Sequence, residues 1–587
     1  MRKISEKDMM NTARLQTSHY PGITGKLAEN ITRNWLIGLY ESNPGILAMF
    51  RERDLLPYRL MLAWLGEFAG KYITGAYYIY RLTLDHELYA YIQGFLEELL
   101  ACQAEDGYLG PFSRQCRLTG SFSQKTDEVE GTWDAWGHYH IMYGLLLWYE
   151  ETSKAPYLQC VEKIAGLFLH KFYNPETGGK RLLALKSPEA NLSPIHAFAM
   201  LYRLTSDRRY LDFALEVEKD LSAEGAGDYI NCALDKLEFY QCPQPRWESL
   251  HVIMGIAELY RITGKKEYLQ TVEQTFYSIL KTDVHNTGAF STEEQAVGNP
   301  FHSGHIETCC VIAYDALGVE LLKLTGNPEI LDFLELAHYN ACMGVWSPTG
   351  RWSTYHTPMA GERHSSVHDI TFHCRAGSPE LNCCSVNAPR GIGMFSEWAV
   401  TQTSSTLCIN AYEDADVITE DRVRIQISGG YPARSKIQIL VKHYTGKLAL
   451  RIPKWSACTT LTADGAKCQP MPGSYFQLDC SGKICIELDL DFTTRYLEGE
   501  EDFKGLVSIY RGPILFGADV SLAGGHDLTK LPPLSRAELE TAPSLSLDGK
   551  IHIPLSCGIT LGDFYHLGVT GSQYTTWLKV EERSRAT

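Results

Sequence analysis

The chain has 587 residues, of which 44% are hydrophobic and 21% are charged, and its formal net charge is −16. This length exceeds what one hydrophobic core usually supports, so two or three globular domains are expected. The negative charge, without a cluster of Lys and Arg, argues against a nucleic-acid partner. No stretch reaches the roughly 18 uninterrupted apolar residues of a membrane span, and the start lacks the apolar core of a signal peptide.

The 17 cysteines are scattered along the chain and do not have the dense, even spacing of a disulfide scaffold. Reduced thiols in a cytoplasm fit this usage better. The sequence therefore predicts an unexported, cytoplasmic protein whose cysteines are mostly small core residues.

The first two-thirds of the chain has the apolar spacing of helices and contains a repeat. In segments such as LYRITGKKEYL, residues 259–269, one helix ends, a short polar turn follows and another helix begins. Stacked helical hairpins bury their faces on one another. By analogy with known folds, closure into an (α/α)6 toroid over residues 1–400 is expected. The turns lie 53 to 69 residues apart and are marked by Thr83, Thr152, Thr205, Thr263 and Thr325.

A predicted helix in residues 131–144, GTWDAWGHYHIMYG, carries side chains suited to sugar binding. Aromatic faces and hydroxyl-bonding groups are the two kinds of contact that a sugar needs. A helix of this composition is more often plain core, so both interpretations stay open. The candidates are Trp133, Asp134, Trp136, His138, Tyr139 and His140.

Two later segments bring thiols and carboxylates together. In TGAFSTEEQAVGNPFHSGHIETCC, residues 287–310, Glu307 and Cys309 stand where a helix is predicted to begin. In ELNCCSVNAPRG, residues 380–391, Cys383 and Cys384 are adjacent. Three thiolates and one carboxylate could complete a tetrahedral zinc shell, although the usual CxxC and HxxxH spacings are absent. Buried free thiols and a redox-labile vicinal pair are the alternatives.

After about residue 400 the sequence pattern changes to short runs of alternating apolar and polar residues, rich in Val, Ile, Thr and Tyr. Examples are RVRIQISGGYP, KIQILVKHY and LVSIYRGPILFGAD. These runs predict a β-sandwich over residues 401–520, followed over 521–587 by further strands that form a second small β domain or complete the sandwich.

The combination of HIETCC with NCCSVNAPRG about 70 residues later resembles the zinc-dependent β-L-arabinofuranosidases of glycoside hydrolase family 127. Four further segments support the resemblance in the expected order: EDGYLGPF at 105–112, HYHIMYGLLLWY at 138–149, LRIPKWS at 450–456 and YRGPILFGAD at 510–519.

That resemblance implies an (α/α)6 catalytic toroid followed by β-sandwich domains, and a retaining mechanism. Carried over by motif, Glu307, Cys309, Cys383 and Cys384 would hold Zn²⁺, and Cys383 would attack the anomeric carbon. Glu294 or Glu293 would be the acid/base, and Glu294 is favoured because TGAFSTE best matches the family's approach to this residue. His140 best matches a substrate-binding histidine, with His251, His302 and His305 as weaker candidates.

The chain also departs from the family pattern. The family's CCPPN is CCSVN here, and Cys310 follows Cys309 where a small residue is common. At a familiar sugar-binding histidine this chain has Asn191, with His196 further on. The metal site is expected to be retained, but the pocket could accept a different sugar.

The predicted function is an exo-acting glycoside hydrolase that releases a terminal β-L-arabinofuranose or related sugar from an oligosaccharide or glycoside, with zinc as cofactor. A homodimer is also expected. One alternative is a sugar epimerase or unsaturated-glycuronyl hydrolase with the same toroid and no cysteine nucleophile. Another is a glycan-binding scaffold whose zinc is structural.

Overall fold

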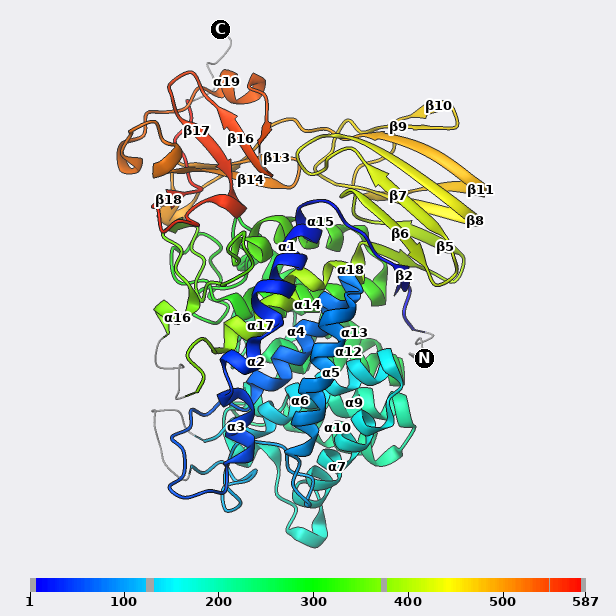
Figure 1. Cartoon of the computed structure of the whole chain (residues 1–587), viewed down its shortest axis with the longest axis vertical. Helices are drawn as coiled ribbons and strands as arrows, with labels where there is room; N and C mark the ends of the chain where they lie inside the picture. The colour runs from blue at the N-terminus through cyan, green and yellow to red at the C-terminus, as the bar shows by residue number, and fades with distance from the viewer. Residues whose placement is uncertain (1–6, 123–130, 371–376, 548, 582–587) are drawn as a thin grey trace.

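The computed structural model describes residues 7–122, 131–370, 377–547 and 549–581. A large helical body carries two β lobes at one end (Figure 1). The core extends through the helical body and into both lobes.

Six helices form a closed inner ring, because each packs on the next and the last packs on the first. Their apolar residues face both the ring interior and the outer helices, so α14 is buried along its whole length. In ring order they are α4 (Glu67–Thr83), α6 (Asp134–Thr152), α9 (Pro194–Thr205), α12 (Ser249–Thr263), α14 (Thr308–Thr325) and α17 (Cys383–Gly393).

An outer helix packs on each inner helix, so the helical body is an (α/α)6 toroid. This arrangement confirms the toroid predicted from the repeated turns. The outer helices are α5 (His86–Ala101), α7 (Ala155–Lys171), α10 (Arg208–Asp220), α13 (Lys266–Thr282), α15 (Pro328–Leu336) and α1 (Ile23–Ile31).

The repeated threonines end five of the inner helices and build the same turn each time. At α14, Thr325 Oγ1 donates to the Leu321 carbonyl at 2.8 Å and accepts from the Asn327 N–H at 3.3 Å. The residue after the threonine, Gly326 in this case, has a positive φ of 62°, which ends the helix. Because these turns mark the C-terminal ends of the inner helices, the N-terminal ends meet at the opposite mouth of the ring.

The first β lobe is a ten-stranded sheet in which only the β5–β8 pair is parallel among the described strands. Its centre is the long antiparallel pair β8 and β11, and two N-terminal strands join its edge through β4 and β6. The strands are β1 (Asn11–Thr12), β2 (Leu15–Thr17), β4 (Val400–Gln402), β5 (Thr406–Ile409), β6 (Ala415–Thr419), β7 (Arg424–Ser428), β8 (Lys436–Ile452), β9 (Thr460–Ala463), β10 (Ala466–Cys468) and β11 (Ser474–Asp489).

The second lobe is an eight-stranded sheet made of β12 to β18 and of the short strand β3, which lies earlier in the chain. The division between the sheets thus falls before residue 520, while the domain limits at 400 and 520 stay predictions. The strands are β12 (Arg495–Glu498), β13 (Val507–Arg511), β14 (Ile514–Asp519), β15 (Leu545–Leu547), β16 (Lys550–Pro554), β17 (Thr560–Asp563), β18 (Tyr574–Thr575) and β3 (Ala360–Gly361).

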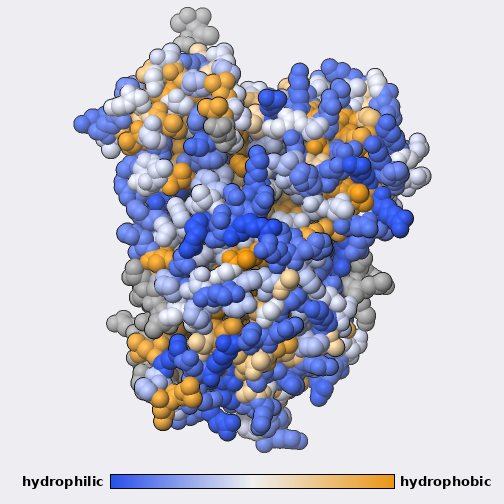
Figure 2. All heavy atoms as spheres, viewed as in Figure 1, coloured by the Kyte–Doolittle hydropathy of each residue, from blue (hydrophilic) through white to orange (hydrophobic). Residues whose placement is uncertain are grey.

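On the face seen in Figure 2, hydrophobic residues are scattered among polar ones, and the surface is hollowed between the two lobes. A cleft of about 830 Å³ lies there, lined by residues of both lobes such as Lys436 and Arg511 and by none of the candidate catalytic residues. Among the described residues, no helix has both the length and the apolarity needed to cross a bilayer. Cytoplasmic location and a homodimer stay predictions.

Candidate metal and catalytic site

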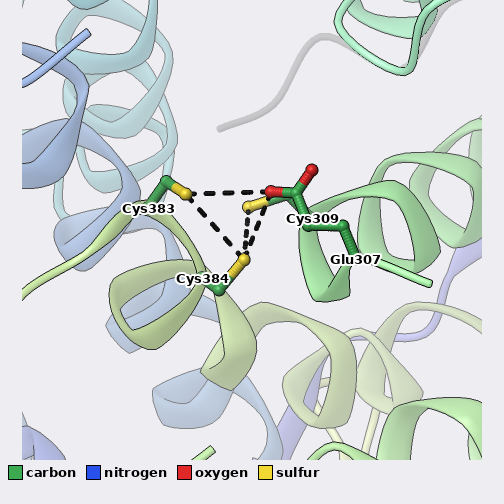
Figure 3. A group of neighbouring side chains, drawn as sticks. All are labelled: Glu307, Cys309, Cys383 and Cys384. Carbon is green, nitrogen blue, oxygen red and sulfur yellow. Dashed lines mark hydrogen bonds between the residues drawn. The ribbon is translucent and has the colours of Figure 1, made fainter. Parts of the chain in front are cut away.

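The N-terminal ends of α14 and α17 bring Glu307, Cys309, Cys383 and Cys384 together inside the ring (Figure 3). Glu307 is the N-cap of α14, and Cys309 is the second residue of that helix. The two adjacent cysteines are the first residues of α17, whose capping box holds them in place through Asn382. Helix N-termini carry partial positive charge, so they favour thiolates and carboxylates.

The four donor atoms lie within 4.8 Å of one another and are almost fully buried. Cys384 Sγ is 3.6 Å from Cys309 Sγ, 3.9 Å from Cys383 Sγ and 3.3 Å from Glu307 Oε1. Cys383 Sγ is 3.7 Å from the same oxygen. The structure thus brings the four predicted residues together, and the group can hold a metal ion.

These separations fit a tetrahedral ion of zinc size. With Zn–S bonds of about 2.3 Å and Zn–O bonds of about 2.1 Å, the edges of a tetrahedron are about 3.8 Å between sulfurs and about 3.6 Å between sulfur and oxygen. The sulfur–sulfur distances of 3.6 and 3.9 Å and the sulfur–oxygen distances of 3.3 and 3.7 Å lie close to those values. Three thiols with one carboxylate are also a donor set that zinc accepts.

Burial makes it costly for all four groups to be ionised together. It raises the pKa of Glu307, with the nearby Cys309 adding to the effect, and it raises the pKa values of Cys383 and Cys384. Burial opposes ionisation of Cys309 too, but hydrogen bonds from the other two cysteines and the Lys71 ammonium hold its pKa well below the usual range. Four ionised donors at this place therefore require a bound cation.

Glu294 and Glu293 occupy a loop that follows α13, but they have different neighbours. Glu294 Oε1 accepts from the Tyr355 hydroxyl at 2.9 Å, and Glu294 Oε2 is 2.9 Å from Arg246 Nη2. Burial raises the pKa of Tyr355, and the nearby Glu307 carboxylate and the Cys383 and Cys384 thiols raise it further. Glu293 is exposed.

Three of the predicted sugar-binding residues pack together at the N-terminal ends of α6 and α12. The rings of His140 and His251 lie 4.3 and 5.0 Å from Trp136. Burial holds the pKa values of both histidines well below the usual range, so both are neutral at physiological pH. Within the described residues, His140 Nε2 is buried without a hydrogen-bond partner.

Other predicted residues make contacts within the protein. The Asp134 carboxylate accepts from the Tyr108 hydroxyl and from the Leu118 N–H at 2.7 Å. His138 Nε2 accepts from the Leu109 N–H at 3.1 Å. His302 is exposed, and its Nδ1 accepts from the Gly304 N–H. Their roles in sugar binding stay predictions.

The positions that depart from the family pattern are also buried near the site. Asn191 donates to the Thr132 and Lys186 carbonyls, at 3.1 and 2.8 Å. His196 Nδ1 lies 3.0 Å from the Tyr139 hydroxyl, which also contacts His251 Nδ1. Cys310 Sγ lies 3.7 Å from Glu307 Oε2, so the additional cysteine contacts Glu307 but is not one of the four clustered donors.

Sequence reasoning missed four side chains that surround the cluster: Lys71, Tyr355, Arg246 and Glu248. Lys71 Nζ lies 3.7 Å from Cys309 Sγ, and Arg246 bridges Glu248 and Glu294. Burial raises the pKa of Glu248 to about 7. For Lys71, Arg246 and Glu248, a polar residue near the start of an inner helix was the available signal, because those starts meet inside the ring. Tyr355 lies in a loop and gave no such signal.

Comparisons with known proteins agree with this geometry. The protein-family model of the β-L-arabinofuranosidase GH127 catalytic domain matches residues 58–397, and the model of the GH127 middle domain matches residues 406–492. A toroid with this catalytic domain defines a glycosidase. The chain belongs to glycoside hydrolase family 127.

Solved structures share the whole fold at low sequence identity. A GH127 β-arabinofuranosidase has 18% identity and a TM-score of 0.79, with 98% of each chain covered. A GH127 β-L-arabinofuranosidase from Geobacillus stearothermophilus T6 has 16% identity and a TM-score of 0.72, covering 96% of this chain and 100% of that one. Comparison with curated proteins gives no significant match.

Proposed function

We propose that the protein is a retaining exo-glycosidase that releases a terminal β-L-arabinofuranose or related sugar, with Cys383 as nucleophile and Glu294 as acid/base. The observation that carries the proposal is the group of three thiols and one carboxylate within 4.8 Å, beside an aromatic and histidine-lined region. Family membership supports the substrate class, because relatives are described as β-L-arabinofuranosidases.

Glu307, Cys309, Cys383 and Cys384 would hold Zn²⁺. The ion would keep the thiols deprotonated at neutral pH and lower the charge on the sulfur that leaves. Cys383 is favoured as the reactive sulfur because its residue is 6% exposed, whereas Cys309 and Cys384 are 0% exposed.

The reaction takes two displacements at the anomeric carbon. In the first, Cys383 Sγ forms a bond to this carbon while the bond to the leaving oxygen breaks, and Glu294 gives that oxygen a proton. In the second, Glu294 takes a proton from water, the water oxygen bonds to the anomeric carbon and the carbon–sulfur bond breaks. The hydrogen bond from Tyr355 and the ion pair with Arg246 orient the Glu294 carboxyl group.

The neutral His140 and His251 suit contacts to sugar hydroxyls, because neutral imidazole offers one donor and one acceptor. Trp136 packs beside both rings and excludes water from this region. The free Nε2 of His140 is the strongest candidate for a direct hydrogen bond to the sugar.

Cys383→Ser tests the proposed nucleophile. A hydroxyl is a far weaker nucleophile at neutral pH, so kcat/KM on an aryl β-L-arabinofuranoside should fall about 10³-fold or more. Cys160→Ser, at a buried cysteine of α7 outside the cluster, should keep most of the activity. Wild-type activity in the Cys383→Ser enzyme, with folding confirmed by circular dichroism, would refute the cysteine mechanism.

A further inference from the structure

Lys71 is a buried cation in direct contact with the cysteine cluster. It lies in the second turn of α4 and has no solvent exposure. Its Nζ is 2.8 Å from Glu67 Oε1 and 3.7 Å from Cys309 Sγ. The same nitrogen lies 4.8 Å from the centre of the Trp247 ring. The three N–H groups of the ammonium therefore have a carboxylate, a sulfur and an aromatic face as partners.

The pair with Glu67 does not by itself explain a lysine at this place. Two charges removed from water lose about as much in hydration as they gain in attraction, so a buried pair is weak evidence for stability. Glu67 is also held by the Trp136 indole N–H, which fixes the carboxylate and through it the ammonium. The consequence is that one N–H of Lys71 is kept directed at Cys309.

The charges of the cluster explain what the contact between Lys71 and Cys309 does. Four ionised donors carry four negative charges, and a divalent cation leaves two of them uncompensated inside the protein. A hydrogen bond from a cation stabilises the sulfur that receives it and makes that sulfur a poorer nucleophile. Among the described contacts, the Lys71 ammonium donates to Cys309 and not to Cys383.

We propose that Lys71 is a positioning residue that holds Cys309 as a permanent metal ligand and so leaves Cys383 as the sulfur that reacts. This inference rests on the proposed function. Lys71 does not touch the sugar in this role. It acts through Cys309, and Glu67 and Trp136 act through Lys71.

Two variants with opposite effects test the role, with Zn²⁺ and Co²⁺ as probes. Lys71→Met keeps most of the length of the side chain and removes its charge, so Zn²⁺ affinity, measured against a chromophoric chelator, should fall about 10–100-fold. The sulfur-to-cobalt absorption band of the Co²⁺-loaded variant should move to longer wavelength, because Cys309 loses its donor. Glu67→Gln keeps a side-chain oxygen that can accept from Lys71 Nζ, so the ammonium stays directed at Cys309 but is less neutralised. This variant should therefore bind Zn²⁺ at least as tightly as wild type.

Each result is informative. The role of Lys71 is refuted by Lys71→Met that binds Zn²⁺ within two-fold of wild type with an unmoved cobalt band, or by Glu67→Gln that binds Zn²⁺ ten-fold or more weakly than wild type. The second outcome would assign the pair to packing alone, and Glu67→Gln decides the matter even if Lys71→Met does not fold. Wild-type protein that binds no Zn²⁺ would instead overturn the metal site, and with it this proposal.

Discussion

Glu293 and Glu294 are neighbours in sequence with different environments. Both have a positive φ, of 53° and 65°, which is uncommon for residues other than glycine. Such a backbone is kept where surrounding contacts hold it, often at functional sites. In this loop Glu294 makes such contacts, with Tyr355 and Arg246, whereas Glu293 is exposed.

Glu294→Gln should therefore lower kcat strongly, and Glu293→Gln is the matched control. Loss of a general acid/base costs about 10²–10⁴-fold in rate. The defect should be larger for a disaccharide than for an aryl glycoside with a good leaving group, which needs little protonation. Steady-state kinetics on both substrates would check this. If Glu293→Gln shows the leaving-group dependence instead, the assignment of the acid/base is reversed.

The sequence allowed the cluster itself to be predicted, but not its surroundings. Adjacent cysteines at 383 and 384 and the Glu–Thr–Cys run at 307–309 are local patterns, so they can be read directly. Lys71 and Tyr355 are brought to the cluster by tertiary packing, and the sequence around them is that of an ordinary helix and an ordinary loop. The closure of the ring decides which polar residues meet.

Among the secondary-structure elements, the helices are easier to predict from the sequence than the pairing of the strands. Each threonine turn is a local signal, because its hydroxyl bonds to the carbonyl four residues earlier in the same helix. The pairing of β1 and β2 with strands about 390 to 400 residues away has no such local signal. It places the first two described strands in the same sheet as β8 and β11.

Inner helix α14 carries a buried carboxyl that the proposed reaction does not use. Asp315 is 2% exposed, and its Oδ1 has no hydrogen-bond partner within the described residues. Burial raises its pKa to about 8, and the Arg390 guanidinium only partly opposes this. The folded protein therefore binds a proton more tightly than the unfolded chain, so stability falls as the pH rises from about 4 to about 8.

Asp315→Asn should stabilise the protein at neutral and alkaline pH, because the amide cannot ionise. At pH 7 the gain in the free energy of unfolding is at most about 4 kcal/mol, and it should shrink towards pH 4. Urea unfolding at several pH values would measure it. Asp212→Asn, at an exposed residue of α10, should stay within about 0.5 kcal/mol of wild type. A gain from Asp315→Asn that does not depend on pH would contradict the assigned cause.

At the scale of the whole molecule, a buried ion pair joins the first β lobe to the toroid. Arg451 of β8 is fully buried, and its Nη2 is 2.6 Å from Asp332 Oδ1 and 3.0 Å from Glu335 Oε2. Both carboxylates belong to the outer helix α15, which packs on α14. The Trp455 indole also donates to Glu335 Oε2 at 3.0 Å. The lobe is thus attached to the helix pair that supplies Glu307 and Cys309.

Arg451→Met should destabilise the protein by about 3–5 kcal/mol, because it leaves two carboxylates without their cation in a buried junction. Lys454→Met is the matched control: Lys454 lies three residues away and pairs with Glu329 of the same helix, but its side chain is 68% exposed, so the loss should be within about 1 kcal/mol. Adding Glu335→Gln to Arg451→Met removes one unpaired charge and should recover part of the stability. Thermal and urea unfolding of the three variants measures the ordering. Equal losses for Arg451→Met and Lys454→Met would mean that water reaches the junction and that Arg451 is not what attaches the lobe to α15.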